Sequence, residues 1–109
     1  MKTNCNDHGS CPSIALKDTE LMEYKVKINK NWQLVETEPQ QIARDFEFDT
    51  YLAGLDFANQ VAQIAEELNH HPNMILGFKK VRVEYYTHNA GGLTEMDFDS
   101  AARIDLLLA

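Results

Sequence analysis

The longest regular pattern in the sequence is an amphipathic run over about residues 50–69. Apolar side chains recur there at intervals of three or four, the spacing of one face of an α-helix. They are Phe57, Val61, Ile64 and Leu68. Asp49 can cap the run, and Pro72 cannot continue it and disfavours helical geometry at His71, so it ends beside the pair His70 and His71. The pattern predicts a helix about 30 Å long with one face buried.

Two pairs of short segments typical of β-strands flank this run. Residues 32–37 and 42–48 precede it, with a turn at Pro39 between them, and residues 74–78 and 80–87 follow it. Apolar residues tend to alternate with polar ones in these segments, as in strands with one buried face. The predicted core-facing residues of the last segment are Val81, Val83 and Tyr85.

A further helix is predicted near each end of the chain. Asp18 or Thr19 can cap the first, and Thr94 with Asp97 forms a capping box that opens the last, which runs to Leu108. The order helix-strand-strand-helix-strand-strand-helix lacks the strict alternation of parallel sheets. It therefore predicts an α+β fold, a four-stranded antiparallel sheet with helices packed on one face. The free edges of such a sheet favour a homodimer or homotetramer.

The chain has 109 residues, the size of one domain, and we assign residues 14–109 to it. Residues 1–13 form a polar stretch that we expect to be a disordered tail. Cys5, His8 and Cys11 lie in this tail with a spacing that can supply soft metal ligands. The spacing offers no fourth ligand, so an inert tail is the favoured interpretation.

The formal charge of −7 disfavours direct binding to nucleic acid. No apolar run approaches the roughly 20 residues that a membrane span requires, and the beginning of the sequence lacks the apolar segment of a secretory signal. We therefore expect a cytoplasmic protein that contacts neither membranes nor nucleic acid directly.

Three histidines and two carboxylates between residues 66 and 97 are the candidates for chemistry, because imidazole exchanges protons near neutral pH. Glu66 lies one helical turn before His70 and either orients its ring or is one more solvated charge. Asp97 has a sufficient role as a capping residue. Adjacent histidines such as His70 and His71 rarely bind one ion, so no metal is expected even with His88 added. Nearby, a glycine pair fits either an anion cradle or a tight turn.

The spacing of these residues resembles that of the pterin-4a-carbinolamine dehydratases. The residues that carry the resemblance are Glu66, His70, His71, Pro72, Phe78, His88 and Asp97. Further matches are Trp32, Leu34, Arg44, Phe46, Phe48, Val61, Ala62, Ala65, Thr87, Ala90, Gly91, Gly92, Leu93, Thr94, Ile104 and Asp105. The resemblance covers about 90 of the 109 residues. The chain departs from the animal members at Asn69, Met74 and Met96, which bears on substrate binding and on rate.

The resemblance implies dehydration of 4a-hydroxytetrahydropterin to quinonoid dihydropterin, with no metal or cofactor. His70 and His88 would act as acid and base, and His71 would mainly hold the pterin. Pro72, Glu66 and Asp97 would complete the binding site. The resemblance also implies recycling of the pterin used by aromatic amino acid hydroxylases, typically phenylalanine hydroxylase. The alternative is a weakly catalytic or non-catalytic member that acts through protein interaction, because animal members also serve as dimerisation partners of a transcription factor.

Overall fold

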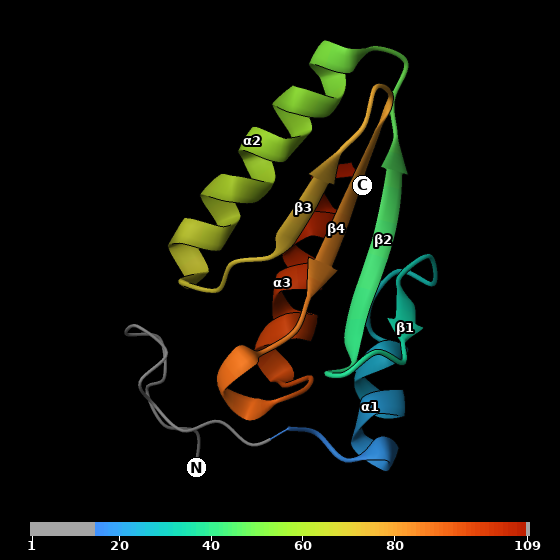
Figure 1. Ribbon diagram of the computed structural model, residues 1–109, viewed down its shortest axis with the longest axis vertical. Coiled ribbons are helices and arrows are strands. Elements are labelled where there is room, and N and C mark those ends of the chain that lie inside the picture. The colour runs from blue at the N-terminus through green and yellow to red at the C-terminus, as the bar shows by residue number, and fades with distance from the viewer. Residues whose placement is uncertain (1–14, 109) are drawn as a thin grey trace.

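The computed structural model describes residues 15–108, which form the predicted α+β fold (Figure 1). The order of elements is α1 (Asp18–Lys25), β1 (Gln33–Val35), β2 (Gln41–Glu47), α2 (Tyr51–Leu68), β3 (Asn73–Leu76), β4 (Lys80–Tyr85), η1 (His88–Ala90), α3 (Glu95–Asp105) and η2 (Leu106–Leu108). The expectations for Cys5, His8 and Cys11 fall outside the described residues. Within residues 15–108, no helix is both long and apolar enough to cross a membrane.

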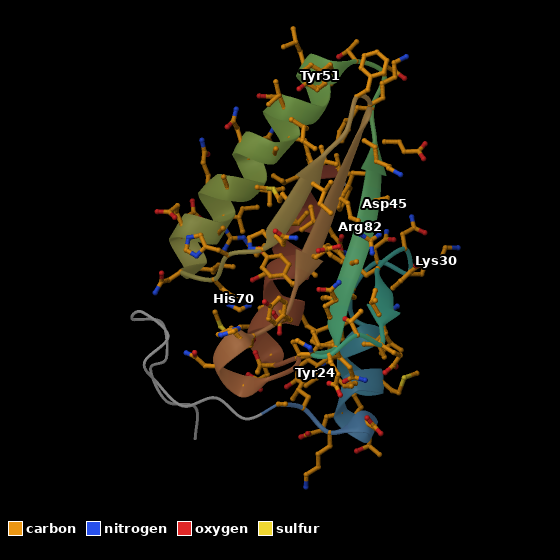
Figure 2. The ribbon with its side chains drawn as sticks, in the orientation of Figure 1. Tyr24, Lys30, Asp45, Tyr51, His70 and Arg82 are labelled. Atoms are coloured by element: carbon orange, nitrogen blue, oxygen red, sulfur yellow. The ribbon has the colours of Figure 1, made fainter. Side chains whose placement is uncertain are left out.

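The sheet has the strand order β1-β2-β4-β3, with every neighbouring pair antiparallel. The two strands of each predicted pair form an antiparallel hairpin, and β4 pairs with β2 so that the two hairpins make one sheet. Figure 1 shows α2 beside β3, and α3 behind the sheet. The other face is polar, where Arg82 donates to both Asp45 and Glu84 (Figure 2). The helices therefore cover one face, and β1 and β3 are left as edges.

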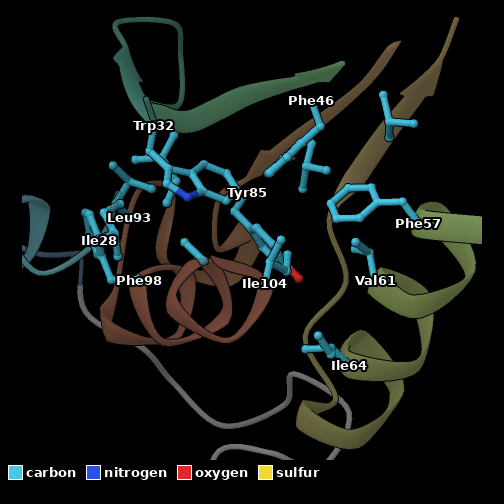
Figure 3. Close-up of a cluster of buried hydrophobic side chains, with 14 of the residues drawn as sticks. Ile28, Trp32, Phe46, Phe57, Val61, Ile64, Tyr85, Leu93, Phe98 and Ile104 are labelled. Carbon is cyan, nitrogen blue, oxygen red and sulfur yellow. The ribbon is translucent and has the colours of Figure 1, made fainter. Parts of the chain in front are cut away.

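The core lies between that covered face and the helices (Figure 3). Val81, Val83 and Tyr85 are fully buried there, as their alternation predicted. The α2 stripe faces them, with Phe57, Val61 and Ile64 buried and Leu68 partly buried against the cluster. Burying each such side chain stabilises the fold by roughly 1.5 to 3 kcal/mol.

Two predicted helix caps are wrong by one residue. Thr50, not Asp49, caps α2, because its Oγ1 accepts the Ala53 N–H at 3.1 Å. In α1 the capping position is Lys17, whose N–H donates to Glu20 Oε1, and Asp18 is already helical. Asp49 and Thr50 are both suitable caps by residue type, so residue type does not choose between them, and Lys17 is not a preferred cap residue.

Three predicted apolar or strand positions are also corrected. β3 ends at Leu76, and Phe78 is 72% exposed in the hairpin turn. Leu108 is 51% exposed because α3 ends at Asp105 and gives way to the short turn η2. β4 ends at Tyr85, so His88 lies in η1 beyond the strand.

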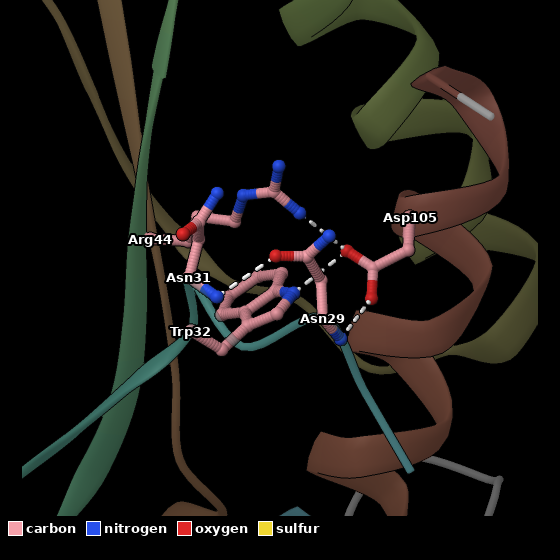
Figure 4. Close-up of polar contacts among 5 residues, drawn as sticks. All are labelled: Asn29, Asn31, Trp32, Arg44 and Asp105. Carbon is pink, nitrogen blue, oxygen red and sulfur yellow. Dashed lines mark hydrogen bonds and ion pairs between the residues drawn. The ribbon is translucent and has the colours of Figure 1, made fainter. Parts of the chain in front are cut away.

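Asp105 joins the end of α3 to the other layers of the fold (Figure 4). Its carboxylate accepts from the Asn29 backbone N–H, from Trp32 Nε1–H and from Arg44 Nη1, at 2.8 to 2.9 Å. These donors come from the loop before β1 and from β2. Asp105 thereby fixes the packing of α3 across the sheet, at the end of α3 opposite the candidate site.

Candidate active site

The C-terminus of α2 directs the two adjacent histidines to different surroundings. Asn69 adopts the left-handed conformation, with φ 52° and ψ 42°. Its N–H donates to Glu66 O at 3.3 Å, and the His70 N–H donates to Ala65 O at 3.1 Å. These bonds form a Schellman motif, which ends the helix at Leu68, four residues before Pro72. The His70 side chain is then 14% exposed and that of His71 is 53% exposed.

His70 is paired with Asp97 at the start of α3. Its Nε2 lies 2.6 Å from Asp97 Oδ1, and the Asp97 side chain has no exposure. The His70 ring also stacks on Tyr85, with ring centroids 5.4 Å apart and planes 15° apart. Figure 2 shows His70 between the end of α2 and the lower end of the sheet. The structure thus joins two of the predicted site residues, 27 positions apart, in one contact.

Asp97 also has the capping role that the sequence predicted. Its Oδ2 accepts the Thr94 backbone N–H at 2.9 Å, within the capping box of α3. The same oxygen accepts the Thr87 hydroxyl at 2.9 Å. A buried carboxylate is tolerated when donors surround it, and the positive end of a helix dipole adds to this stabilisation. Capping and histidine binding therefore use different oxygens of one side chain.

Glu66 does not orient His70, as its helical spacing suggested, but pairs with His71. Glu66 Oε2 lies 2.6 Å from His71 Nε2. The reason is the left-handed Asn69, which interrupts the helical repeat before the fourth residue is reached. Both partners are more than half exposed, so the pair contributes less than about 1 kcal/mol to folding. Glu66 also lines an open hollow on the outer face of α2, on the solvent side of that helix.

His88 is exposed at the first position of η1, and its ring lies edge-on to Tyr86 at 6.3 Å between centroids. The turn that carries it is closed by the Thr87 carbonyl, which accepts from the Ala90 and Gly91 N–H groups at 3.1 Å. Gly91 has φ +69°, a conformation that favours glycine. The glycine pair therefore serves a tight turn, and its N–H groups are engaged within the chain rather than free for an anion.

Tyr85 is the buried residue on which the His70 ring stacks. Burial raises the pKa of Tyr85 to about 12, and the Asp97 charge acts in the same direction, whereas the nearby Ser100 hydroxyl lowers it. Within residues 15–108, neither the Tyr85 nor the Ser100 hydroxyl has a hydrogen bond of normal geometry. The phenol is therefore neutral at physiological pH and supports His70 as an uncharged stacking surface.

The structure thus places His70 and Asp97 in direct contact, His71 with Glu66, and His88 one residue from Thr87, whose hydroxyl binds Asp97. Pro72 follows on the half-buried connection to β3. In the described part of the chain, no group of three or more histidine, cysteine, aspartate or glutamate side chains is arranged to hold a metal ion. The sequence reasoning assigned no role to the Thr87 hydroxyl or to Tyr85, because burial and strand position alone accounted for them.

The α+β fold described above is that of one known class of protein. The family model described as pterin 4 alpha carbinolamine dehydratase matches residues 14–107, and the chain belongs to this family. A relative from Nitrosomonas eutropha, named "Putative pterin-4-alpha-carbinolamine dehydratase", is 39% identical over 100 residues. That match covers 92% of this chain and 84% of the relative.

Two solved structures share the fold. A protein from Brucella melitensis, described as a transcriptional coactivator/pterin dehydratase, has a TM-score of 0.80 and 29% identity, covering 87% of this chain and 99% of that one. A pterin dehydratase-like protein described as a RuBisCO assembly factor in the alpha-carboxysome has a TM-score of 0.60 and 26% identity, covering 71% and 88%. The fold is thus found in proteins described with different roles.

Proposed function

We propose that this chain removes water from 4a-hydroxytetrahydropterin and forms quinonoid dihydropterin. The observation that carries this proposal is the His70–Asp97 pair, 2.6 Å between Nε2 and Oδ1, in a member of the dehydratase family. An imidazole held at one nitrogen by a buried carboxylate is oriented to exchange a proton at the other. That proton exchange is what the elimination of water from a carbinolamine requires.

The reaction needs one proton delivered to the departing 4a-hydroxyl and one removed from the ring nitrogen. We assign these two transfers to His70 and His88 acting as acid and base. His71, backed by Glu66, would hold the pterin at the exposed rim, and Pro72 would fix the corner that presents both histidines. Asp97 would keep His70 oriented. The proposed mechanism uses no metal and no cofactor besides the pterin substrate.

In the cell, this activity would recycle the pterin used by an aromatic amino acid hydroxylase, such as phenylalanine hydroxylase. We place it in the cytoplasm, as a homo-oligomer. Within residues 15–108 there is no helix that could cross a membrane, and the net charge of −7 disfavours nucleic acid as a direct partner.

The direct test measures the decay of 4a-hydroxytetrahydropterin, generated by a coupled hydroxylase, with and without purified protein. We expect acceleration by the wild-type chain. His70→Ala and His88→Ala should each lower the rate by roughly 100-fold or more, the usual contribution of one acid-base group, and the double variant should abolish it. Unaccelerated decay with folded wild-type protein would contradict the proposal.

Two control variants, His8→Ala and Glu67→Gln, distinguish loss of a site residue from a general loss of folded protein. His8→Ala removes the one histidine to which the proposal gives no role, and should leave the rate unchanged. Glu66→Gln should raise KM more than it lowers kcat, because Glu66 contacts the proposed binding residue His71. Glu67→Gln changes the neighbouring carboxylate, which accepts from Arg103 instead, and should alter neither constant.

The second candidate is a protein-binding role without efficient catalysis. It is favoured by the two similar structures described as a coactivator and as an assembly factor. The same assay discriminates between the candidates. A rate equal to that of the double histidine variant, in a protein that forms a stable complex with a partner, would select the binding role.

A further inference from the structure

We infer that Thr87 is a positioning residue of this site: its hydroxyl holds the Asp97 carboxylate so that Asp97 fixes which ring nitrogen of His70 carries the proton. The consequence for catalysis rests on the function proposed above. The assignment of the proton does not, because it can be measured in the protein without substrate.

The Thr87 hydroxyl has two hydrogen-bond partners but only one hydrogen to donate. Thr87 Oγ1 lies 2.9 Å from Asp97 Oδ2 and 2.7 Å from Thr94 Oγ1. A hydroxyl has one hydrogen, and an ionised carboxylate only accepts. Thr87 therefore donates to Asp97, and the bond between the two hydroxyls is donated by Thr94. The hydrogen bonds run in one direction, from Thr94 through Thr87 to Asp97.

The two carboxylate oxygens of Asp97 bind different donors. Its Oδ2 accepts from the Thr87 hydroxyl and from the Thr94 backbone N–H, both at 2.9 Å, and the side chain is excluded from solvent. Two donors on one oxygen favour the ionised carboxylate, which accepts on both oxygens. Oδ1 then accepts from His70 Nε2–H at 2.6 Å. A neutral imidazole has only one N–H, so Nδ1 of His70 is the nitrogen left to exchange a proton with a pterin.

The backbone and the side chain of Thr87 are both held in position. It lies two residues beyond the end of β4, and it forms a bridge with Gly92 through its N–H, which donates to Gly92 O at 2.9 Å. Its β-branched side chain has few rotamers, so the hydroxyl is held in place. Its backbone carbonyl meanwhile closes the turn that carries His88. The side chain of Thr87 thus acts on His70, and its backbone acts on His88.

This division makes Thr87→Val a selective test. Valine has nearly the shape of threonine, lacks the hydroxyl and keeps the backbone bonds of the His88 turn. It leaves the Thr94 hydroxyl without its acceptor and removes one of the donors to Asp97. We expect kcat to fall by about 10-fold to 100-fold, the usual effect of one hydrogen bond to a charged group, with little change in KM. Thr87→Ser keeps the hydroxyl and should restore most of the rate.

The decisive measurement is the tautomer of His70, read from the ¹⁵N chemical shifts of its ring in labelled protein without substrate. In the wild type we expect the Nε2–H form. Thr87→Val should add a measurable share of the Nδ1–H form, because Asp97 is then held by one hydrogen bond fewer and its Oδ1 is no longer fixed against Nε2. Thr87→Ser should match the wild type. An Nδ1–H form in the wild type, or identical ring shifts in wild type and a folded Thr87→Val, would overturn the inference.

The wild-type tautomer decides the proton assignment even if Thr87→Val does not fold. In that event, the comparison between Thr87→Ser and Thr87→Ala replaces it. The two proposals also fail separately. Absence of dehydratase activity in the wild type contradicts the proposed function while the ring shifts still report on Thr87, and altered tautomers without any change in kcat would refute the catalytic consequence alone.

Discussion

Tyr85 shows how one side chain of the site serves folding as well as chemistry. Its ring is fully buried in the core and stacks on the imidazole of His70. The phenol lies in an environment that excludes water and includes the negative charge of Asp97. Both conditions oppose ionisation, so the fold depends on this tyrosine remaining protonated.

This dependence predicts a loss of stability at alkaline pH. The folded pKa of Tyr85 is about 12, above its ordinary value of 10. Its contribution to the free energy of unfolding is thus complete below pH 10 and is lost as the pH rises through about 12. In urea unfolding between pH 10 and about 12, the wild type should lose up to about 1.4 kcal/mol more per pH unit than Tyr85→Phe does. Equal slopes for the two proteins would contradict the assignment.

For individual residues, the sequence predicted which residues form the site better than it predicted which of them contact one another. His70, Asp97 and the capping box were identified from spacing, and the box is confirmed. The four-residue spacing suggested that Glu66 could orient His70. That spacing brings two side chains together only while the helix continues, and the left-handed Asn69 ends the helix before His70. The contact between Thr87 and Asp97 depends on how β4 lies against α3, which no local pattern contains.

At the scale of elements, the end of α2 is set by Asn69 rather than by Pro72. Glycine, which has no Cβ, adopts the left-handed backbone conformation without strain. For other residues this conformation costs about 1 kcal/mol of stability, unless the side chain compensates, as that of asparagine often does. The motif matters because it sends His70 toward α3 and His71 toward solvent.

We predict that Asn69→Gly is about 1 kcal/mol more stable than Asn69→Ala. Both variants lose the amide side chain, so their difference isolates the left-handed conformation with φ 52°. In thermal unfolding the glycine variant should melt roughly 4 to 8 °C higher. If the alanine variant melts at the same temperature or higher, the left-handed turn does not control the end of this helix.

The succession of helices and strands was predictable because each element has a distinct periodicity or turn signal. Their ends were less predictable. Neighbouring residues such as Asp49 and Thr50 are equally good caps by type, and the choice depends on which oxygen reaches a free N–H. The exposure of Phe78 likewise follows from the position of the β3–β4 turn, which the alternation of apolar residues placed too late.

For the whole molecule, the two edges of the sheet differ. β1 has only three residues, whereas β3 presents Ile75 and Leu76, which are 51% and 40% exposed, next to the exposed Phe78. A strand edge flanked by exposed apolar side chains is a template for pairing with another copy. The homo-oligomer that we propose is therefore expected to form through β3.

Sedimentation of the purified wild-type chain should give a dimer or a larger assembly. Ile75→Lys places a charge on the edge strand and should shift the equilibrium toward the monomer by roughly 10-fold or more, a common cost of burying an unpaired charge. Val26→Lys is a suitable control, because Val26 is 77% exposed and follows α1, outside the sheet. A monomeric wild type, or equal shifts in the two variants, would exclude assembly through β3.

The double task of Asp97 affects how working enzymes of this fold can be recognised from sequence. One of its oxygens caps α3, so a protein that had lost the dehydration reaction would still be selected to keep this aspartate for stability. Within residues 15–108 the His88 side chain makes no hydrogen bond, and selection for folding alone would not retain it. Between two chains that both carry the aspartate, the histidine after Thr87 should therefore separate catalysts from scaffolds.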